Sequence, residues 1–167
     1  MSCVLHLSDP HFGTEQAPVM DALERFAHEL RPDLLLLSGD ITQRARRAQF
    51  AAARAFVDRL RAPVLLAVPG NHDIPLFNLA ARVFAPYGNY VRAFGGELEP
   101  QFADRDLLVV GVNTTRPARH KNGVVSAAQI ERVVVRGGQA IAIYAAEEEG
   151  TRWSAFVREN GEWKSDD

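Results

Sequence analysis

Three short polar groups whose side chains can bind a metal ion stand directly after three runs of aliphatic residues. They are Asp9-Pro10-His11, Gly39-Asp40 and Gly70-Asn71-His72-Asp73. Carboxylate oxygen and imidazole nitrogen both serve Zn, Mn or Fe, and an asparagine oxygen adds a neutral ligand. Two such ions about 3.5–4 Å apart clamp a phosphoryl group during an in-line displacement. The residue types therefore predict a phosphoesterase site with divalent metal ions.

Each of these groups taken singly has a plainer interpretation. An Asp that follows a strand is often a helix cap or a turn residue, and the sequence Gly-Asn-His-Asp can be an ordinary turn. Three such groups in succession, each after an apolar run, favour one shared site over three separate turns. In that site Asp9 and His11 can face one ion, Asp40 can bridge two ions with its two oxygens, and Asn71 and His72 arrive from the third group.

The apolar runs predict three buried strands, at residues 3–7, 33–37 and 63–68. Two amphipathic helices are expected between them. The first carries Val19, Leu23, Phe26 and Leu30 on one face, and the second spans residues 44–60. A β-α-β-α-β order predicts right-handed crossovers over a parallel sheet, so the fold class is α/β. Ligands bind outside the carboxyl ends of strands in such sheets, which is where all three polar groups lie.

The second half of the chain has a mixed pattern. We expect a short helix over 77–84 that Pro86 ends, an irregular segment over 87–100, and a fourth strand over 107–112 that ends at Asn113-Thr114-Thr115. A helix over 126–133 has Ser126 as its N-cap. Strands follow at 140–144, 151–157 and 162–164, with Asn160-Gly161 as a hairpin turn and the acidic residues 147–149 in a solvated loop.

Composition limits the class of protein. The 167 residues suit one domain, and 47% apolar with 24% charged residues is ordinary for a globular protein with a core. A net charge of −2 gives no strong field toward nucleic acid or an anionic membrane. Cys3 is the single cysteine, which rules out an intrachain disulfide, and no run of about 20 apolar residues predicts a membrane span. We expect a cytoplasmic protein that acts on a small phosphate ester.

In this order and in this β-α-β-α-β context, the three polar groups resemble the first three motifs of the calcineurin-like metallophosphoesterases. The resemblance covers roughly residues 1–130. The chain is most similar to the bacterial branch related to cyclic-nucleotide and glycerophosphodiester phosphodiesterases, in which a His-Xaa-Ser sequence like His6-Leu7-Ser8 also precedes the first motif.

The resemblance implies a role for each matching residue. Asp9 and His11 would hold the first metal ion, Asp40 would bridge, and Asn71 would bind the second ion. His72 would stand beside the leaving group as a proton donor or a stabiliser of charge, and Asp73 would orient His72. The expected cofactors are Mn, Fe or Zn ions, two in the family and one or two in this chain.

The chain departs from the family after its fourth strand. Family members continue with a strand that ends in a metal-binding His and later with a Gly-His-Xaa-His sequence, whereas this chain has no histidine after residue 120. We expect a single domain over 1–167, in which 1–135 is the family-like portion and 136–167 is an atypical β-rich tail. The fold is thus a shortened, layered metallophosphoesterase-like fold with its first half intact.

Three residues beyond the fourth strand are candidates for substrate binding. Arg116, Arg119 and His120 lie in a basic loop that the resemblance places on the substrate side, where cations can meet a phosphate. The same loop has a plainer interpretation as a solvated segment, and His120 as a metal ligand is a further alternative. We expect His6 to be a packed residue near the site and His28 to face solvent.

Two hypotheses of different classes remain open. In the first, the chain is a metal-dependent phosphoesterase with an incomplete set of protein ligands, completed by water or by a second chain, and with reduced activity. In the second, it is a non-catalytic relic or binding module that keeps half of the metal site and binds one metal, a nucleotide or a partner. A shortened sheet exposes apolar edges, which favours a homo-oligomer.

Overall fold

The first three strands form the expected parallel sheet. The computed structural model describes residues 3–105, 107–119, 122–135, 140–144, 156–159 and 162–165. β1 (Val4–Ser8), β2 (Leu34–Gly39) and β3 (Val64–Pro69) pair in the order β1-β2-β3. They are connected by α1 (Ala17–Leu30) and α2 (Arg47–Leu60). The predicted β-α-β-α-β order is therefore confirmed, and the carboxyl ends of the three strands meet at one edge.

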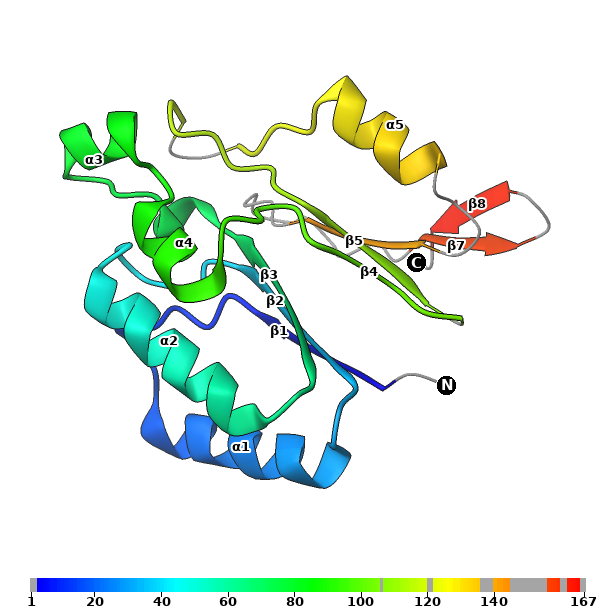
Figure 1. The fold of residues 1–167 in the computed structure, drawn as a ribbon, viewed down its shortest axis with the longest axis horizontal. Coiled ribbons are helices and arrows are strands. Elements are labelled where there is room, and N and C mark those ends of the chain that lie inside the picture. The colour runs from blue at the N-terminus through cyan, green and yellow to red at the C-terminus, as the bar shows by residue number, and fades with distance from the viewer. Residues whose placement is uncertain are drawn as a thin grey trace.

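The middle strand β2 is buried on both faces. Leu35 and Leu37 belong to the apolar cluster beneath α1 and α2, whereas Leu34 and Leu36 pack with Val109 on the opposite face. Figure 1 shows the two helices on one side of this sheet and β5 on the other. An unbroken run of leucines suits such a strand because neither face meets water.

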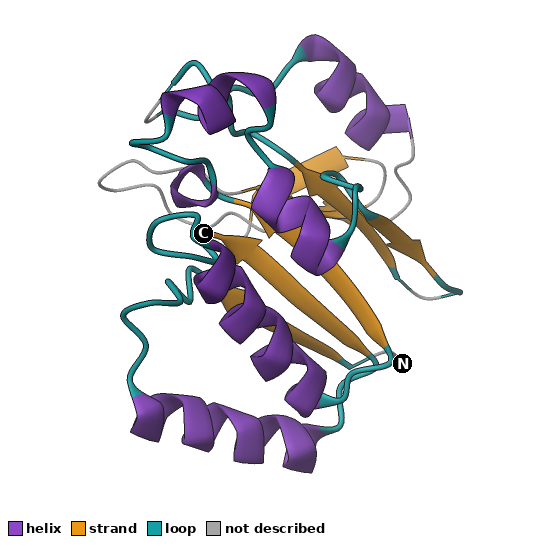
Figure 2. Ribbon diagram, turned by 60° about the vertical axis from the view of Figure 1, so that its left-hand side comes forward, coloured by secondary structure: helices purple, strands orange, loops and turns teal. Residues whose placement is uncertain are grey.

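A second sheet stacks on the first. β4 (Gln101–Ala103), β5 (Leu108–Val112) and β6 (Ala140–Tyr144) lie in the order β4-β5-β6; β4 and β5 are antiparallel, and β5 and β6 are parallel. β5 contacts β3 and β6 contacts β2. α5 (Ala127–Val135) connects β5 to β6 and lies on the outer side of the second sheet (Figure 1). The layers thus run helix, sheet, sheet, helix, which is the shortened α/β fold expected from the sequence; Figure 2 shows the strands between the helices.

The C-terminal region is rich in strands, as predicted. β6 has the expected bounds, and β7 (Phe156–Glu159) pairs with β8 (Glu162–Ser165) as an antiparallel hairpin in which Glu159 lies opposite Glu162. The predicted strand over 151–157 is described only from Phe156 onward. The turn residues 160–161 and the acidic residues 147–149 lie outside the described residues.

Helix α1 presents a different face to the core than its sequence pattern predicts. Val19, Phe26 and Leu30 are exposed, and the helix packs instead through Leu23 and Ala27. The predicted stripe of Val19, Leu23, Phe26 and Leu30 was therefore wrong for three of its four members. By contrast, the apolar residues of α2 that stand at helical spacing are all buried: Phe50, Ala53, Val57 and Leu60.

The segment predicted to be irregular contains a helix. After α3 (Leu79–Phe84), which matches the predicted short helix, α4 spans Gly88–Phe94. Tyr90 is the residue that anchors α4, since its ring is 1% exposed and its hydroxyl donates a 2.7 Å hydrogen bond to the Ala67 carbonyl of β3. Tertiary packing thus forms a helix where two glycines nearby disfavour one.

In the described ranges, no helix is long and apolar enough to cross a membrane.

The stacking of the two sheets predicts a specific effect of Gly111→Ala. A Cβ atom at Gly111 would lie 2.9 Å from Pro100 and 3.0 Å from Val68 of the facing sheet. Because the neighbour at Pro100 includes backbone, we expect Gly111→Ala to destabilise the fold by about 1–3 kcal/mol. Urea denaturation followed by circular dichroism measures this. Gly96→Ala is the matched control, since nothing lies within 4 Å of a Cβ there; equal losses in both variants would contradict the stacking.

Candidate metal centre

The turns that follow β1 and β2 are joined by backbone hydrogen bonds beyond the ends of the strands. The amides of Asp9, His11 and Phe12 donate to the carbonyls of Ser38, Asp40 and Ile41 at 3.0, 3.0 and 2.8 Å. Asp9 and His11 have φ angles of 52° and 46°, in the left-handed region that non-glycine residues rarely adopt. The parallel course of the two turns holds both residues at the sheet edge despite this conformational cost.

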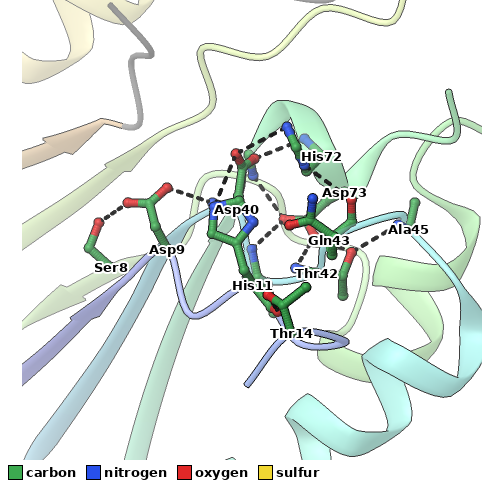
Figure 3. A network of polar contacts seen from close by, with 12 residues as sticks. Ser8, Asp9, His11, Thr14, Asp40, Thr42, Gln43, Ala45, His72 and Asp73 are labelled. Atoms are coloured by element: carbon green, nitrogen blue, oxygen red, sulfur yellow. Dashed lines mark hydrogen bonds and ion pairs between the residues drawn. The ribbon is translucent and has the colours of Figure 1, made fainter. Parts of the chain in front are cut away.

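The carboxylate of Asp40 is at the centre of the site. Its side chain is 2% exposed, and its Oδ1 accepts a 2.8 Å hydrogen bond from the backbone amide of His72. Its Oδ2 lies 3.9 Å from Nε2 of His11 and 4.0 Å from Nε2 of His72. The two imidazole rings are perpendicular, with centroids 5.2 Å apart. Figure 3 shows both rings beside Asp40. Residues from all three strand ends therefore converge on one carboxylate.

These three side chains fit a divalent metal ion. One ligand atom from each of His11, Asp40 and His72 can be chosen so that all lie within 4.8 Å of one another. Ligand atoms that share an ion at about 2.0–2.2 Å each lie no more than about 4 Å apart, close to the spacing seen here. In addition, Nδ1 of His11 is buried without a hydrogen-bond partner among the described residues. The nitrogen of His11 that faces Asp40 is Nε2, so the fit to an ion rests on the spacing and the chemistry of the three donors.

The orientation of His72 is set by the backbone of the second turn. Its Nδ1 lies 3.1 Å from the carbonyl oxygen of Gln43. A carbonyl can only accept a hydrogen bond, so Nδ1 carries the proton of that bond and Nε2 faces Asp40. The Gln43 carbonyl thus helps to orient His72, and no sequence pattern indicates this contact because a backbone carbonyl makes it.

Asp73 is completely buried and joins the second turn to the third. Its Oδ1 accepts hydrogen bonds from the amide and hydroxyl of Thr42, both at 2.8 Å, and its Oδ2 accepts from the amides of Ile41 and Gly70 at 3.1 and 3.0 Å. Burial raises the pKa of Asp73 to about 7, while the hydrogen bonds from Gly70 and Thr42 act in the opposite direction. Asp73 therefore positions the turns that carry Asp40 and His72.

Two glycines allow the turns to approach this closely. A Cβ atom at Gly70 would lie 2.1 Å from Oδ1 and 2.6 Å from the amide nitrogen of Asp40. At Gly39, where φ is +80°, a Cβ would lie 2.5 Å from Oδ1 of Asp9. Both positions require the absence of a side chain, which explains the Gly-Asp and Gly-Asn pairs in the sequence.

The other two predicted ligands lie next to the cluster. Asp9 directs Oδ1 at the backbone amide of Asp40, 3.1 Å away, and Oδ2 accepts from the hydroxyl of Ser8 (Figure 3). Asn71 is half-buried in the 3-10 turn η1 (Asn71–Asp73), immediately before His72. The structure thus brings His11, Asp40 and His72 together most closely, and Asp9 and Asn71 adjoin them.

Of the remaining described histidines, His28 is exposed as expected. The expectation that His6 is packed was wrong: His6 is exposed, because it lies on the opposite face of β1 from the buried Leu5 and Leu7. Nε2 of His6 lies 2.8 Å from the hydroxyl of Ser38, and desolvation lowers the pKa of His6 while the charge of Asp9 opposes this. His28 is exposed on α1, and its Nε2 lies 2.7 Å from the Arg59 carbonyl. His120 lies outside the described residues.

The arginines of the loop after β5 differ in their surroundings. Arg116 donates from Nη1 to the carbonyls of Asn113 and Thr115 at 3.0 and 2.7 Å, and from Nη2 to Gln129 at 3.3 Å. Its guanidinium therefore supports the loop. Arg119 has an exposed side chain, and its carbonyl accepts a 2.7 Å hydrogen bond from Arg82.

A polar network that the sequence did not indicate fixes the end of β5 to α5. Glu99 accepts hydrogen bonds from the Asn113 amide at 3.1 Å and from the Gln129 side chain, and it forms a 2.7 Å ion pair with Arg132. Burial raises the pKa of Glu99, but the bonds from Arg132, Gln129 and Asn113 outweigh it and hold that pKa below its usual value.

At the start of α5, the amide of Gln129 donates to the hydroxyl of Ser126 at 3.2 Å, which confirms the predicted N-cap.

Comparison with known proteins agrees with the fold and with the cluster at its edge. The family model described as calcineurin-like phosphoesterase matches residues 4–160. The chain therefore belongs to the calcineurin-like phosphoesterase family. The match continues beyond residue 135, where we expected the family-like portion to end.

One curated relative is the glycerophosphodiester phosphodiesterase GpdQ of Enterobacter lignolyticus. It is 35% identical over 81 residues, which is 41% of this chain and 28% of the relative. The chain thus matches little more than a quarter of that protein's length.

The buried carboxylate of Asp73 predicts a large effect of Asp73→Asn on stability. Either orientation of the new amide turns an NH₂ group, which cannot accept, toward two of the donors on Ile41, Thr42 and Gly70. We expect a loss of about 1–3 kcal/mol in the free energy of unfolding, measured by urea denaturation. Asp58→Asn is the control, since the Asp58 side chain is 55% exposed. An unchanged midpoint for Asp73→Asn would mean that this carboxylate does not join the turns.

Proposed function

We propose that this chain hydrolyses a phosphodiester or phosphomonoester with the help of one or two divalent metal ions held by Asp9, His11, Asp40 and Asn71. The observation that carries the proposal is the convergence of two imidazole Nε2 atoms on the buried Asp40 carboxylate, at 3.9 and 4.0 Å. Membership of a phosphoesterase family gives the reaction class. The similarity to GpdQ favours a phosphodiester among the possible esters.

Some residues of the site would hold the metal ions, and others would contact the substrate. A divalent ion bound there withdraws charge from a phosphoryl oxygen and lowers the pKa of water. Asp40 would bridge the ions, His11 would add a nitrogen, and Asp9 and Asn71 would add oxygen ligands from the flanking turns. Mn, Fe and Zn all suit this mixture of oxygen and nitrogen donors.

His72 would act on the departing group, whereas Asp73 would hold the turns in place. With Nδ1–H donating to the Gln43 carbonyl, Nε2 of His72 faces the site. When the ring carries a second proton, Nε2–H would donate it to the leaving oxygen or would stabilise the charge there. Asp73 fixes the turns through its hydrogen bonds and keeps His72 in place indirectly. Arg119 and His120 are proposed to meet the phosphate, whereas the contacts of Arg116 favour a structural role.

The second candidate function is a binding module with little or no turnover. The observation that favours it is the absence of any histidine after residue 120, which leaves fewer imidazoles than a complete dinuclear site of the family uses. Such a protein would bind one metal ion, a nucleotide or a partner through the same edge.

A cytoplasmic location, expected from the single cysteine, stays a prediction.

The two functions are separated by the variant Asp40→Asn. If the site is catalytic, manganese-stimulated hydrolysis of a chromogenic phosphodiester by the native chain falls by on the order of 10³-fold in Asp40→Asn, because the central ligand loses its charge. Asp58→Asn is the control, with an exposed carboxylate. Equal turnover in the native chain and in Asp40→Asn would contradict the proposal that the site is catalytic and would favour the binding module.

The variant His72→Ala tests the division of roles. We expect it to retain the metal content of the native chain and to lose about 10²–10⁴-fold in rate, since a proton donor contributes by this amount. Metal content by elemental analysis and hydrolysis rate are measured together, with His28→Ala as the control on exposed α1. Loss of one metal equivalent in His72→Ala would instead identify His72 as a ligand.

A further inference from the structure

Helix α3 presents its apolar side chains to solvent and its charged residue to the protein. Phe77, Leu79, Val83 and Phe84, here called the α3 patch, are 69–85% exposed. Arg82 is 8% exposed, and its guanidinium donates to the carbonyls of Pro75 and Arg119 at 3.1 and 2.7 Å. The helix is therefore oriented the opposite way from an ordinary surface helix, whose apolar face packs on the core.

This orientation is held in place by specific bonds. The two bonds of Arg82 join α3 to the segment after η1 and to the loop after β5, and the Asn78 side chain caps the helix by accepting from the Ala81 amide at 3.0 Å. A helix of six residues is too short to be stable in water by itself. An outward apolar face on such a helix is explained if another surface covers it.

The composition and the area of the α3 patch point to its partner. Between Phe77 and Pro86 the single charged residue is Arg82, which points inward, so the outward surface carries no charge. A charged partner would lose its hydration there without compensation, whereas the same patch on another copy is equally uncharged. The four side chains expose roughly 500 Å², the size of the largest apolar patch on a typical monomer, and a patch of that size is often an interaction site. Two copies would bury about 1,000 Å² in total, the lower limit of a specific interface.

We propose that two copies of this chain associate through their α3 patches in a symmetric dimer. A two-fold arrangement places each patch against its own equivalent, so the contact is closed and does not propagate. The proposal does not depend on the catalytic role of Asp40 or His72.

The test is the mass of the native chain in solution, measured by light scattering after gel filtration. We expect a dimer of twice 18.4 kDa that dissociates on dilution. Phe84→Glu and, separately, Val83→Glu convert it to the monomer without changing the circular dichroism spectrum. Phe26→Glu, on an exposed phenylalanine of α1, is the matched control and stays dimeric.

A second measurement locates the contact. In a Cys3→Ser background, a short bis-maleimide should cross-link Val83→Cys into dimers and leave Val19→Cys, which is exposed on α1, as monomers. Any of four results would overturn the proposal. The native chain could be a monomer, or its dimer could survive both glutamate variants. The chain could instead associate without limit, or Phe26→Glu could lose the dimer as fully as the other two variants do. Flotation with phosphatidylcholine–phosphatidylglycerol vesicles that Phe84→Glu abolishes, without a dimer, would overturn it in favour of a membrane surface.

Discussion

The arrangement of the site depends on one buried carboxylate. Asp73 accepts hydrogen bonds from Thr42, Ile41 and Gly70, and so it joins the turn that carries Asp40 to the turn that carries His72. A buried carboxylate is costly unless its oxygens are fully hydrogen-bonded, and here each oxygen has two donors. The same four donors would be left unsatisfied if the carboxylate were absent. The two turns are therefore stable only together.

The turn after β1 is joined to this pair by backbone bonds and by one side chain. His11 and Phe12 donate to the second turn, and the carboxylate of Asp9 accepts from the Asp40 amide. Asp40 is thus held from two sides, since its own Oδ1 accepts from the His72 amide. A site assembled in this way is preorganised before a metal ion arrives, which lowers the cost of gathering like-charged or polar ligands at one point.

The sequence was informative where one physical requirement dominated. The run of leucines in β2 identified a strand buried on both faces, and the polar groups after three such runs identified the edge where the site lies. Gly39 and Gly70 stand next to Asp40 and Asn71 for steric reasons that the motifs already contain. These features are local, so the pattern of residues alone is enough to predict them.

The sequence was less informative where the tertiary structure decides. The face of α1 that packs on the core depends on its contact with the sheet, and Ala27, which has little apolar surface, is completely buried while Phe26 is exposed. Helix α4 forms because Tyr90 packs beneath the first sheet's edge and bonds Ala67, despite a sequence with weak helix propensity. The contact of His72 with the Gln43 carbonyl has no trace in side-chain identity.

The metal centre is tested most directly by titrating the native chain with Mn²⁺ and following the free ion by electron paramagnetic resonance, with His11→Ala as the paired variant. If the three turns form a metal site around Asp40, the native chain binds Mn²⁺ saturably and His11→Ala binds it at least about 10-fold more weakly, since one ligand is removed. A native chain that binds no Mn²⁺ saturably, or that binds it as tightly without His11, would contradict the assignment of this edge as a metal centre.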